Sequence, residues 1–87
     1  MRWRVILTAP AERELRTLPD AVERRIVRRL RTLRSDPRPP GCLKLAGAEG
    51  LWRLRIGDYR IIYRIEDAVL VVLVIRIAHR RDVYRGP

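Results

Sequence analysis

The chain has 87 residues, 47% of them hydrophobic, and a formal net charge of +10. These values exclude a disordered chain and favour one folded domain over residues 1–87. Arginine supplies nearly all of the positive charge, since Lys44 is the only lysine, and its planar head group makes two-pronged contacts with phosphate. The composition therefore favours nucleic acid or an acidic protein as the partner.

Cysteine content and the lengths of the apolar runs indicate the environment in which the chain folds. The single cysteine, Cys42, excludes an internal disulfide and a cysteine-based metal site, which is typical of a reducing, cytoplasmic setting. The apolar run over residues 5–7 is too short for a signal peptide. The longest apolar run, residues 68–75, is far short of the roughly 20 residues that cross a bilayer. The carboxylates form no ligand cluster, so we expect no metal. We also expect no cofactor, and the lack of a lipid-facing segment gives no support for a membrane partner.

The first strand and the first helix are predicted in the N-terminal part of the chain. We expect a strand over Trp3–Leu7 and a helix that starts at Thr8, because Pro10 is tolerated in a first helical turn. The narrow apolar stripe of this helix consists of Ala11, Leu15 and Leu18.

A second helix is predicted after the break at Pro19. Asp20 and Glu23 resemble a capping box at its start, and the helix stops by Asp36 because Pro37 disfavours helical geometry in the residue before it. Its buried stripe consists of Val22, Ile26, Leu30 and Leu33. Its other faces carry Arg24, Arg25, Arg28, Arg29 and Arg31. These arginines form a solvated face, a surface that docks on RNA, or a contact for an acidic partner.

A β-hairpin is predicted over Leu51–Arg64, with the two-residue turn Gly57–Asp58. Such a turn defines the pairing register, and side chains alternate between the two faces of a strand. The apolar face consists of Trp52, Leu54, Ile56, Tyr59, Ile61 and Tyr63, and the other face carries Arg53, Arg55, Arg60 and Arg64. Arg55 is expected directly opposite Arg60, where like charges oppose pairing. Either an anion binds there or the face is simply solvated.

Two further segments complete the predicted fold. Residues 36–50 are rich in Pro and Gly and are expected to form a loop that Leu43 and Leu45 anchor to the core. A turn near residues 66–68 leads into a strand over Val69–Ile77, whose two apolar faces indicate a central position. The order β-α-α-β-β-β predicts an α+β fold, in which an antiparallel sheet is covered on one face by an N-terminal helical hairpin.

The pairing of the last strand decides where His79 lies. If the turn after Ile65 has two residues, odd-numbered positions share the arginine-bearing face, and His79 joins Arg53, Arg55 and Arg60. A slip of one residue inverts this assignment.

These residue types suit the metal-independent cleavage of RNA. The 2′-hydroxyl is the nucleophile, and the reaction needs a base, charge stabilisation and an acid. Arginines stabilise the phosphate but are not bases. His79 is the one side chain whose ordinary pKa is near neutrality, and Tyr84 can contact the phosphate, stack on a base or donate a proton. Alternatively, His79 is a surface residue and Tyr84 packs the chain end.

Two segments are specific to a known family: GDYRIIY at residues 57–63 and HRRDVY at residues 79–84. With Leu18–Pro19, Asp36–Pro37 and Lys44–Leu45, they resemble the RelE/ParE superfamily of type II toxin–antitoxin toxins over nearly the whole chain. The RelE branch is the closer resemblance, and it implies a toxin that cuts mRNA in the ribosomal A site by attack of the 2′-hydroxyl.

The resemblance implies a role for each site residue. Arg60 holds the phosphate, Arg80 assists the leaving oxygen and Tyr84 orients or stacks on the base. Arg53 and Arg55 serve the cleavage by contacting RNA. Beyond the resemblance, we expect Arg81 to bind RNA and His79 or Tyr84 to take over part of the proton transfer. The chain departs from the best-known RelE pattern, which has lysines at positions 53 and 55, and arginine at these positions does not readily act as a base.

The resemblance also implies partners and alternatives. A cognate RelB-like antitoxin with an acidic helical segment would cover the basic surface, the ribosome and mRNA would be the targets, and operator DNA would be bound only through the antitoxin complex. The ParE branch shares the fold but inhibits DNA gyrase, and the HRRDVY segment favours RelE over it. A third possibility is a non-catalytic module that binds nucleic acid or an antitoxin.

Overall fold

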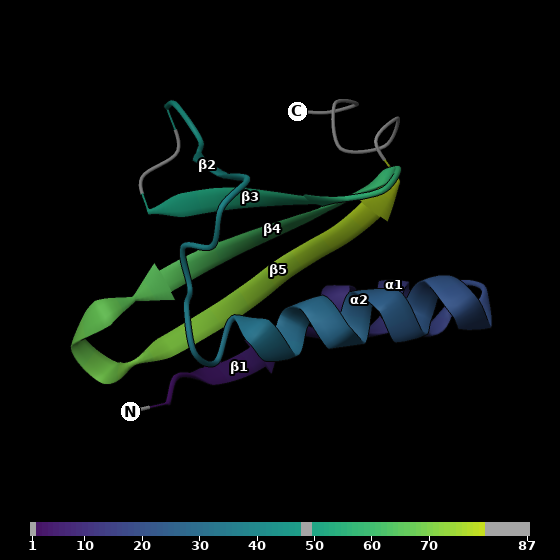
Figure 1. The fold of residues 1–87 in the computed structure, drawn as a ribbon, viewed down its shortest axis with the longest axis horizontal. Coiled ribbons are helices and arrows are strands. Elements are labelled where there is room, and N and C mark those ends of the chain that lie inside the picture. The colour runs from purple at the N-terminus through teal and green to yellow at the C-terminus, as the bar shows by residue number, and fades with distance from the viewer. Residues whose placement is uncertain (1, 48–49, 80–87) are drawn as a thin grey trace.

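The fold is built from a mixed β-sheet and two helices (Figure 1). A computed structural model describes residues 2–47 and 50–79 of the chain. In chain order the elements are β1 (Arg4–Leu7), α1 (Ala9–Arg16), α2 (Asp20–Thr32), β2 (Cys42–Lys44), β3 (Leu51–Ile56), β4 (Tyr59–Glu66), a short 3-10 helix (Asp67–Val69) and β5 (Val71–His79). The strand order is β1-β5-β4-β3-β2. The α+β class is confirmed.

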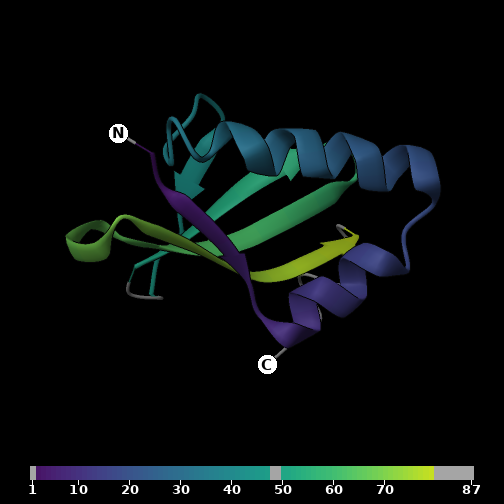
Figure 2. The same ribbon diagram turned by 90° about the horizontal axis from the view of Figure 1, so that it is seen from below.

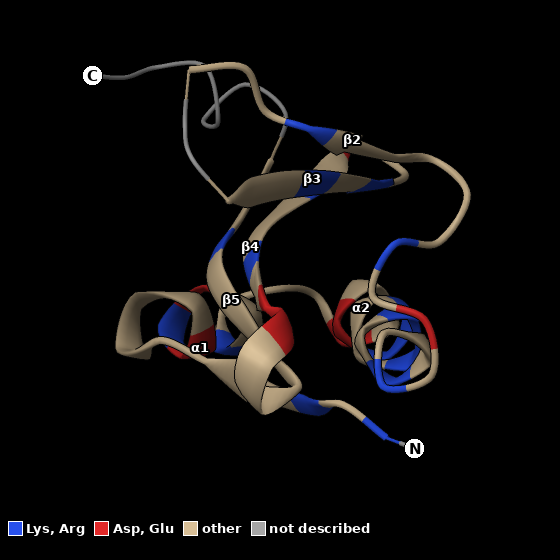
Figure 3. Cartoon of the chain, turned by 90° about the vertical axis from the view of Figure 1, so that its left-hand side faces the viewer, with Lys and Arg blue, Asp and Glu red and all other residues tan. Residues whose placement is uncertain are grey.

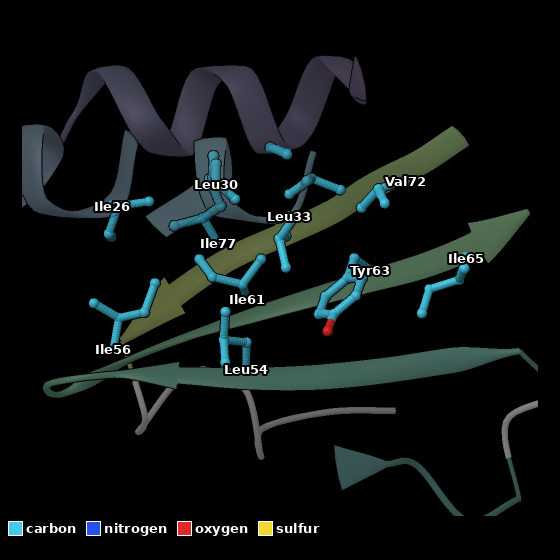
Figure 4. Packing of buried hydrophobic residues seen from close by; sticks show 12 residues of the cluster. Ile26, Leu30, Leu33, Leu54, Ile56, Ile61, Tyr63, Ile65, Val72 and Ile77 are labelled. Atoms are coloured by element: carbon cyan, nitrogen blue, oxygen red, sulfur yellow. The ribbon is translucent and has the colours of Figure 1, made fainter. Parts of the chain in front are cut away.

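One hydrophobic core joins the helices to one face of the sheet. Helix α2 runs across this face and α1 packs against β5 (Figures 1 and 2). The predicted stripe of α2 is confirmed, because Ile26, Leu30 and Leu33 are buried against the apolar face of the hairpin. Figure 4 shows these side chains meeting Leu54, Ile61 and Tyr63 from β3 and β4. No helix in the described residues is long and apolar enough to span a membrane.

The helix starts show one confirmed prediction and one that is wrong. Thr8 caps α1 as expected, since its Oγ1 accepts from the amide of Ala11 (3.2 Å) and donates to the carbonyl of Ile75 (2.9 Å). The capping box at Asp20 does not form. Pro19 is the cap residue, in an extended conformation and without a side-chain bond, and Asp20 is already helical. Asp20 instead places its negative charge in the first turn, where the helix dipole favours it.

The segment expected to be a loop contains the short strand β2, which pairs with β3. Cys42 lies opposite Leu54 and packs on the core, so the next residue points to the other face. Leu43 is therefore 53% exposed, and its expected anchoring to the core is wrong. The sheet also differs from a purely antiparallel one because β1 runs parallel to β5.

Tyr63 of β4 anchors the segment that follows α2 to the sheet. Its side chain is fully buried, and its hydroxyl donates to the carbonyl of Pro37 at 2.9 Å. Burial raises the pKa of the Tyr63 phenol well above its ordinary value. Arg38, the next residue along, lies over the ring of Trp52 and forms an ion pair with Asp67 at 3.0 Å. These contacts hold the segment that leads into β2.

Candidate nucleic-acid interface

The predicted register of the hairpin is confirmed at every position from Leu51–Arg64 to Ile56–Tyr59. Arg53, Arg55, Arg60 and Arg64 therefore share the face of the sheet opposite the core, which we call the arginine face. Figure 3 shows basic residues along β3, β4 and α2. The face also receives Leu43 of β2, which lies opposite Arg53. Sequence reasoning missed this neighbour because the three-residue β2 was not expected.

The arginines of this face differ in exposure. Arg60 lies on the central strand β4, between Arg55 and Ala78, and is only 8% exposed. Arg53 is half-buried, whereas Arg55 is exposed. The difference follows from the length of β2, which pairs with residues 52–54 and ends before it reaches Arg55. A simple solvated face is therefore wrong for Arg60, since charged side chains are seldom buried without a specific arrangement around them.

Two carboxylates, Glu66 and Glu14, pair with arginines near this face. Arg64 lies 3.8 Å from Glu66, so its charge is partly offset. Glu14 of α1 holds the edge of β5, because it accepts from Nε of Arg76 (2.7 Å) and from the amide of Ile77 (2.8 Å). The Arg55 Nε donates to the carbonyl of Gly57 at 3.4 Å. Arg53, Arg55 and Arg60 lie toward the hairpin end of the face.

His79 does not join the arginines, and that expectation is wrong. Val72 and Val74 pair with Ile65 and Tyr63 as the expected alternation requires, but the register then shifts. The shift leaves Ile75 as an extra residue, so the faces of all later positions are inverted. His79 consequently pairs with Tyr59 on the core side.

The surroundings of His79 are those of a separate cleft. Its ring makes a T-shaped contact with Tyr59, with centroids 5.4 Å apart. The cleft has a volume of about 350 Å³ and is also lined by Glu14, Thr17 and Arg76. Thus the structure brings Arg53, Arg55 and Arg60 together but separates His79 from them by the sheet. Arg80, Arg81 and Tyr84 lie outside the described residues. Within residues 2–47 and 50–79, no group of three or more His, Cys, Asp or Glu could hold a metal ion.

The chain is similar over most of its length to known proteins. Residues 5–84 match the family described as the ParE toxin of the type II toxin–antitoxin system parDE. The chain is 33% identical to the toxin RelG of Mycobacterium tuberculosis, over 98% of this chain and 99% of that protein. It is 36% identical to the toxin RelE of the same organism, over 95% and 87% respectively.

The fold is also shared with a solved relative. The archaeal RelE–RelB complex of Pyrococcus horikoshii OT3 contains a chain that superimposes with a TM-score of 0.82 at 30% identity, covering 99% of this chain and 100% of that one. The family match and these relatives agree with the resemblance carried by the hairpin and the C-terminal motif. The chain therefore belongs to the ParE toxin family and is a type II toxin–antitoxin toxin of the RelE branch.

Proposed function

We propose that this toxin is a metal-independent endoribonuclease that cleaves mRNA in the ribosomal A site. The observation that carries the proposal is the pairing of Arg55 with the buried Arg60 on one face, with Arg53 beside them. Such a concentration of guanidinium groups opposes pairing by itself and favours a phosphate as the bound group. The RelE-type relatives support the same activity.

The proposed reaction divides the work among residues of both motifs. The 2′-oxygen attacks the adjacent phosphorus and loses its proton, a cyclic phosphate forms, and the departing 5′-oxygen takes up a proton. Arg60 holds the phosphate from a fixed position, and the more exposed Arg53 and Arg55 approach the strand from solvent. Pre-positioned charge of this kind is usually the largest single contribution that an enzyme makes to the reaction rate.

The C-terminal motif supplies the remaining groups in this proposal. Arg80 assists the leaving oxygen, Arg81 binds RNA, and Tyr84 orients the base and takes part in proton transfer. The contact of His79 with Tyr59 on the core side favours Tyr84 over His79 for the proton. Tyr84 can serve as a base only if surrounding arginines lower its pKa.

We also propose a cognate antitoxin of the RelB type as the protein partner. Solved relatives include the RelBE2 complex of Mycobacterium tuberculosis and the archaeal RelE–RelB complex. The net charge of +10 supports an acidic partner that covers the basic surface in the cell.

The decisive experiment is mRNA cleavage on purified ribosomes, mapped by primer extension. Wild type should give ribosome-dependent cuts that Arg60→Ala/Arg80→Ala abolishes. Arg2→Ala/Arg13→Ala is the control, because it removes two arginines that lie off the hairpin and should cut as wild type does. Intact mRNA with wild type would reject the proposal, and a gyrase supercoiling assay would then test the ParE-like alternative.

A further inference from the structure

A second basic site lies beside the hairpin turn, on the flank of α2. It is a hollow of about 290 Å³, lined by Arg25, Arg28, Arg29 and Thr32 of α2 and by Arg55 and Gly57. The three α2 arginines are spaced so that they share one side of the helix. Burial of Ile26 and Leu30 sets the rotation of α2 that turns this side toward the hairpin.

Gly57 lets α2 and the hairpin approach each other closely. A Cβ atom at residue 57 would lie 3.0 Å from Nη1 of Arg25, closer than such atoms normally come. The residue also has a φ of +60°, which glycine adopts without a steric penalty. The guanidinium of Arg25 therefore lies directly over the turn.

The charge in this hollow is unbalanced. Its described lining includes four arginines and no carboxylate. The neighbouring hollow on α2, which shares Arg28 with this one, differs because Asp20 and Glu23 accompany Arg24 and Arg31 there. Four like charges within one hollow repel each other, and an anion that bridges them removes the repulsion. The difference between the two hollows thus marks the one beside the hairpin as a site for an anion.

Arg55 connects the hollow to the arginine face. Its position on β3 puts it opposite Arg60, while its Nε bond to the carbonyl of Gly57 directs the guanidinium toward the turn. We propose that the hollow is a second phosphate-binding site, which holds the RNA backbone to one side of the cleaved phosphate. This inference rests on the proposed function. A polymer with regularly spaced phosphates fits two basic sites that are joined by a shared arginine.

The test compares two pairs of substitutions on the same helix. Arg25→Gln/Arg29→Gln removes charge from the hollow, and Arg24→Gln/Arg31→Gln removes the same charge from the neighbouring hollow. The probe is a short, fluorescently labelled 2′-O-methyl RNA, which cannot be cleaved, and binding is followed by anisotropy across a salt series. The first pair should weaken binding roughly tenfold. It should also reduce the magnitude of the slope of log affinity against log salt concentration (the salt slope) by about 0.7 to 1.4, whereas the control pair should leave this slope near that of wild type.

A conservative pair of substitutions controls for misfolding of the variants. Arg25→Lys/Arg29→Lys keeps the charge but loses the two-pronged geometry, so the salt slope should stay near that of wild type while affinity falls by a smaller factor. Thermal melts of all variants show whether the fold is kept.

Each outcome separates the inference from the proposed function. If wild type cuts mRNA on ribosomes and binds the probe, but the hollow and control pairs behave alike, the inference fails and the function stands. If wild type neither binds the probe nor cuts mRNA, the proposed function fails. If only the affinity for the purified antitoxin falls in the hollow pair, the hollow is an antitoxin contact and the inference is overturned.

Discussion

Arg55 and Arg60 lie directly opposite each other on β3 and β4, yet Arg60 is 8% exposed while Arg55 reaches solvent. Two positive charges in this position lower the stability of the hairpin. A phosphate bound between the two guanidinium groups would turn this destabilisation of the hairpin into a stabilisation. We therefore expect the pair to cost stability in the free protein and, under the proposed function, to contribute to the affinity for RNA.

Substitution of Arg55 should separate stability from activity. Arg55→Gln is expected to raise the free energy of unfolding by about 0.2–1 kcal/mol, because it removes the cross-strand repulsion. Cleavage on ribosomes should fall at the same time. Urea denaturation at low and high salt measures the first effect, which should shrink as salt screens the charges. A loss of stability at low salt would contradict this account of the pair.

Tyr63→Phe should destabilise the fold by about 1–3 kcal/mol, since it leaves the carbonyl of Pro37 without its donor. Tyr59→Phe is the matched control. The half-buried ring of Tyr59 contacts His79 edge to face, and removal of the hydroxyl leaves this ring contact in place. Urea midpoints of the two variants, compared with wild type, measure the difference. Equal midpoints would show that the bond to Pro37 contributes nothing.

The same tyrosine predicts how stability depends on alkaline pH. Burial raises the pKa of Tyr63 in the folded state, so above its ordinary value of about 10 the unfolded chain binds fewer protons. Stability is then present below pH 10 and lost above it, by about 1.4 kcal/mol per pH unit. Denaturant titrations from pH 8 upward should show this loss, and Tyr63→Phe should lack it.

Glu14 is expected to contribute more to stability than an ordinary surface carboxylate, because it bonds both Arg76 and the amide of Ile77. Glu14→Ala should cost about 1.5–3 kcal/mol. The control is Glu12→Ala, whose exposed pair with Arg16 at 2.7 Å should be worth about 0.3–0.5 kcal/mol. Hydrogen exchange of the Ile77 amide should accelerate only in the Glu14 variant. Similar losses in both would show that α1 is held by apolar contacts alone.

The position of His79 predicts an asymmetry between the two candidate proton-transfer residues. His79→Ala should leave the pH–rate profile of mRNA cleavage unchanged, because the ring lies on the core side of the sheet. Tyr84→Phe should lower the single-turnover rate, by roughly 10²–10⁴-fold if the hydroxyl moves a proton. A profile altered by His79→Ala and not by Tyr84→Phe would reverse the assignment.

Local sequence signals determine much of this protein without any tertiary contact. The Gly57–Asp58 turn defined which hairpin residues share a face, since a two-residue loop leaves one register. The stripe of α2 and the Thr8 cap likewise depend on neighbours only a few residues away. These features predicted the apolar core and the arginine face.

Only the tertiary structure decided where His79 and Leu43 lie. The face of His79 depends on one extra residue, Ile75, in the pairing of β5 with β4, and no signal at the C-terminal motif reports that shift. Leu43 faces the arginines because the three-residue β2 forms only when β3 is beside it. An alternation of period two predicts which residues share a face within one hairpin. One extra residue in the pairing of a strand with its neighbour, however, inverts the face of every later position in that strand.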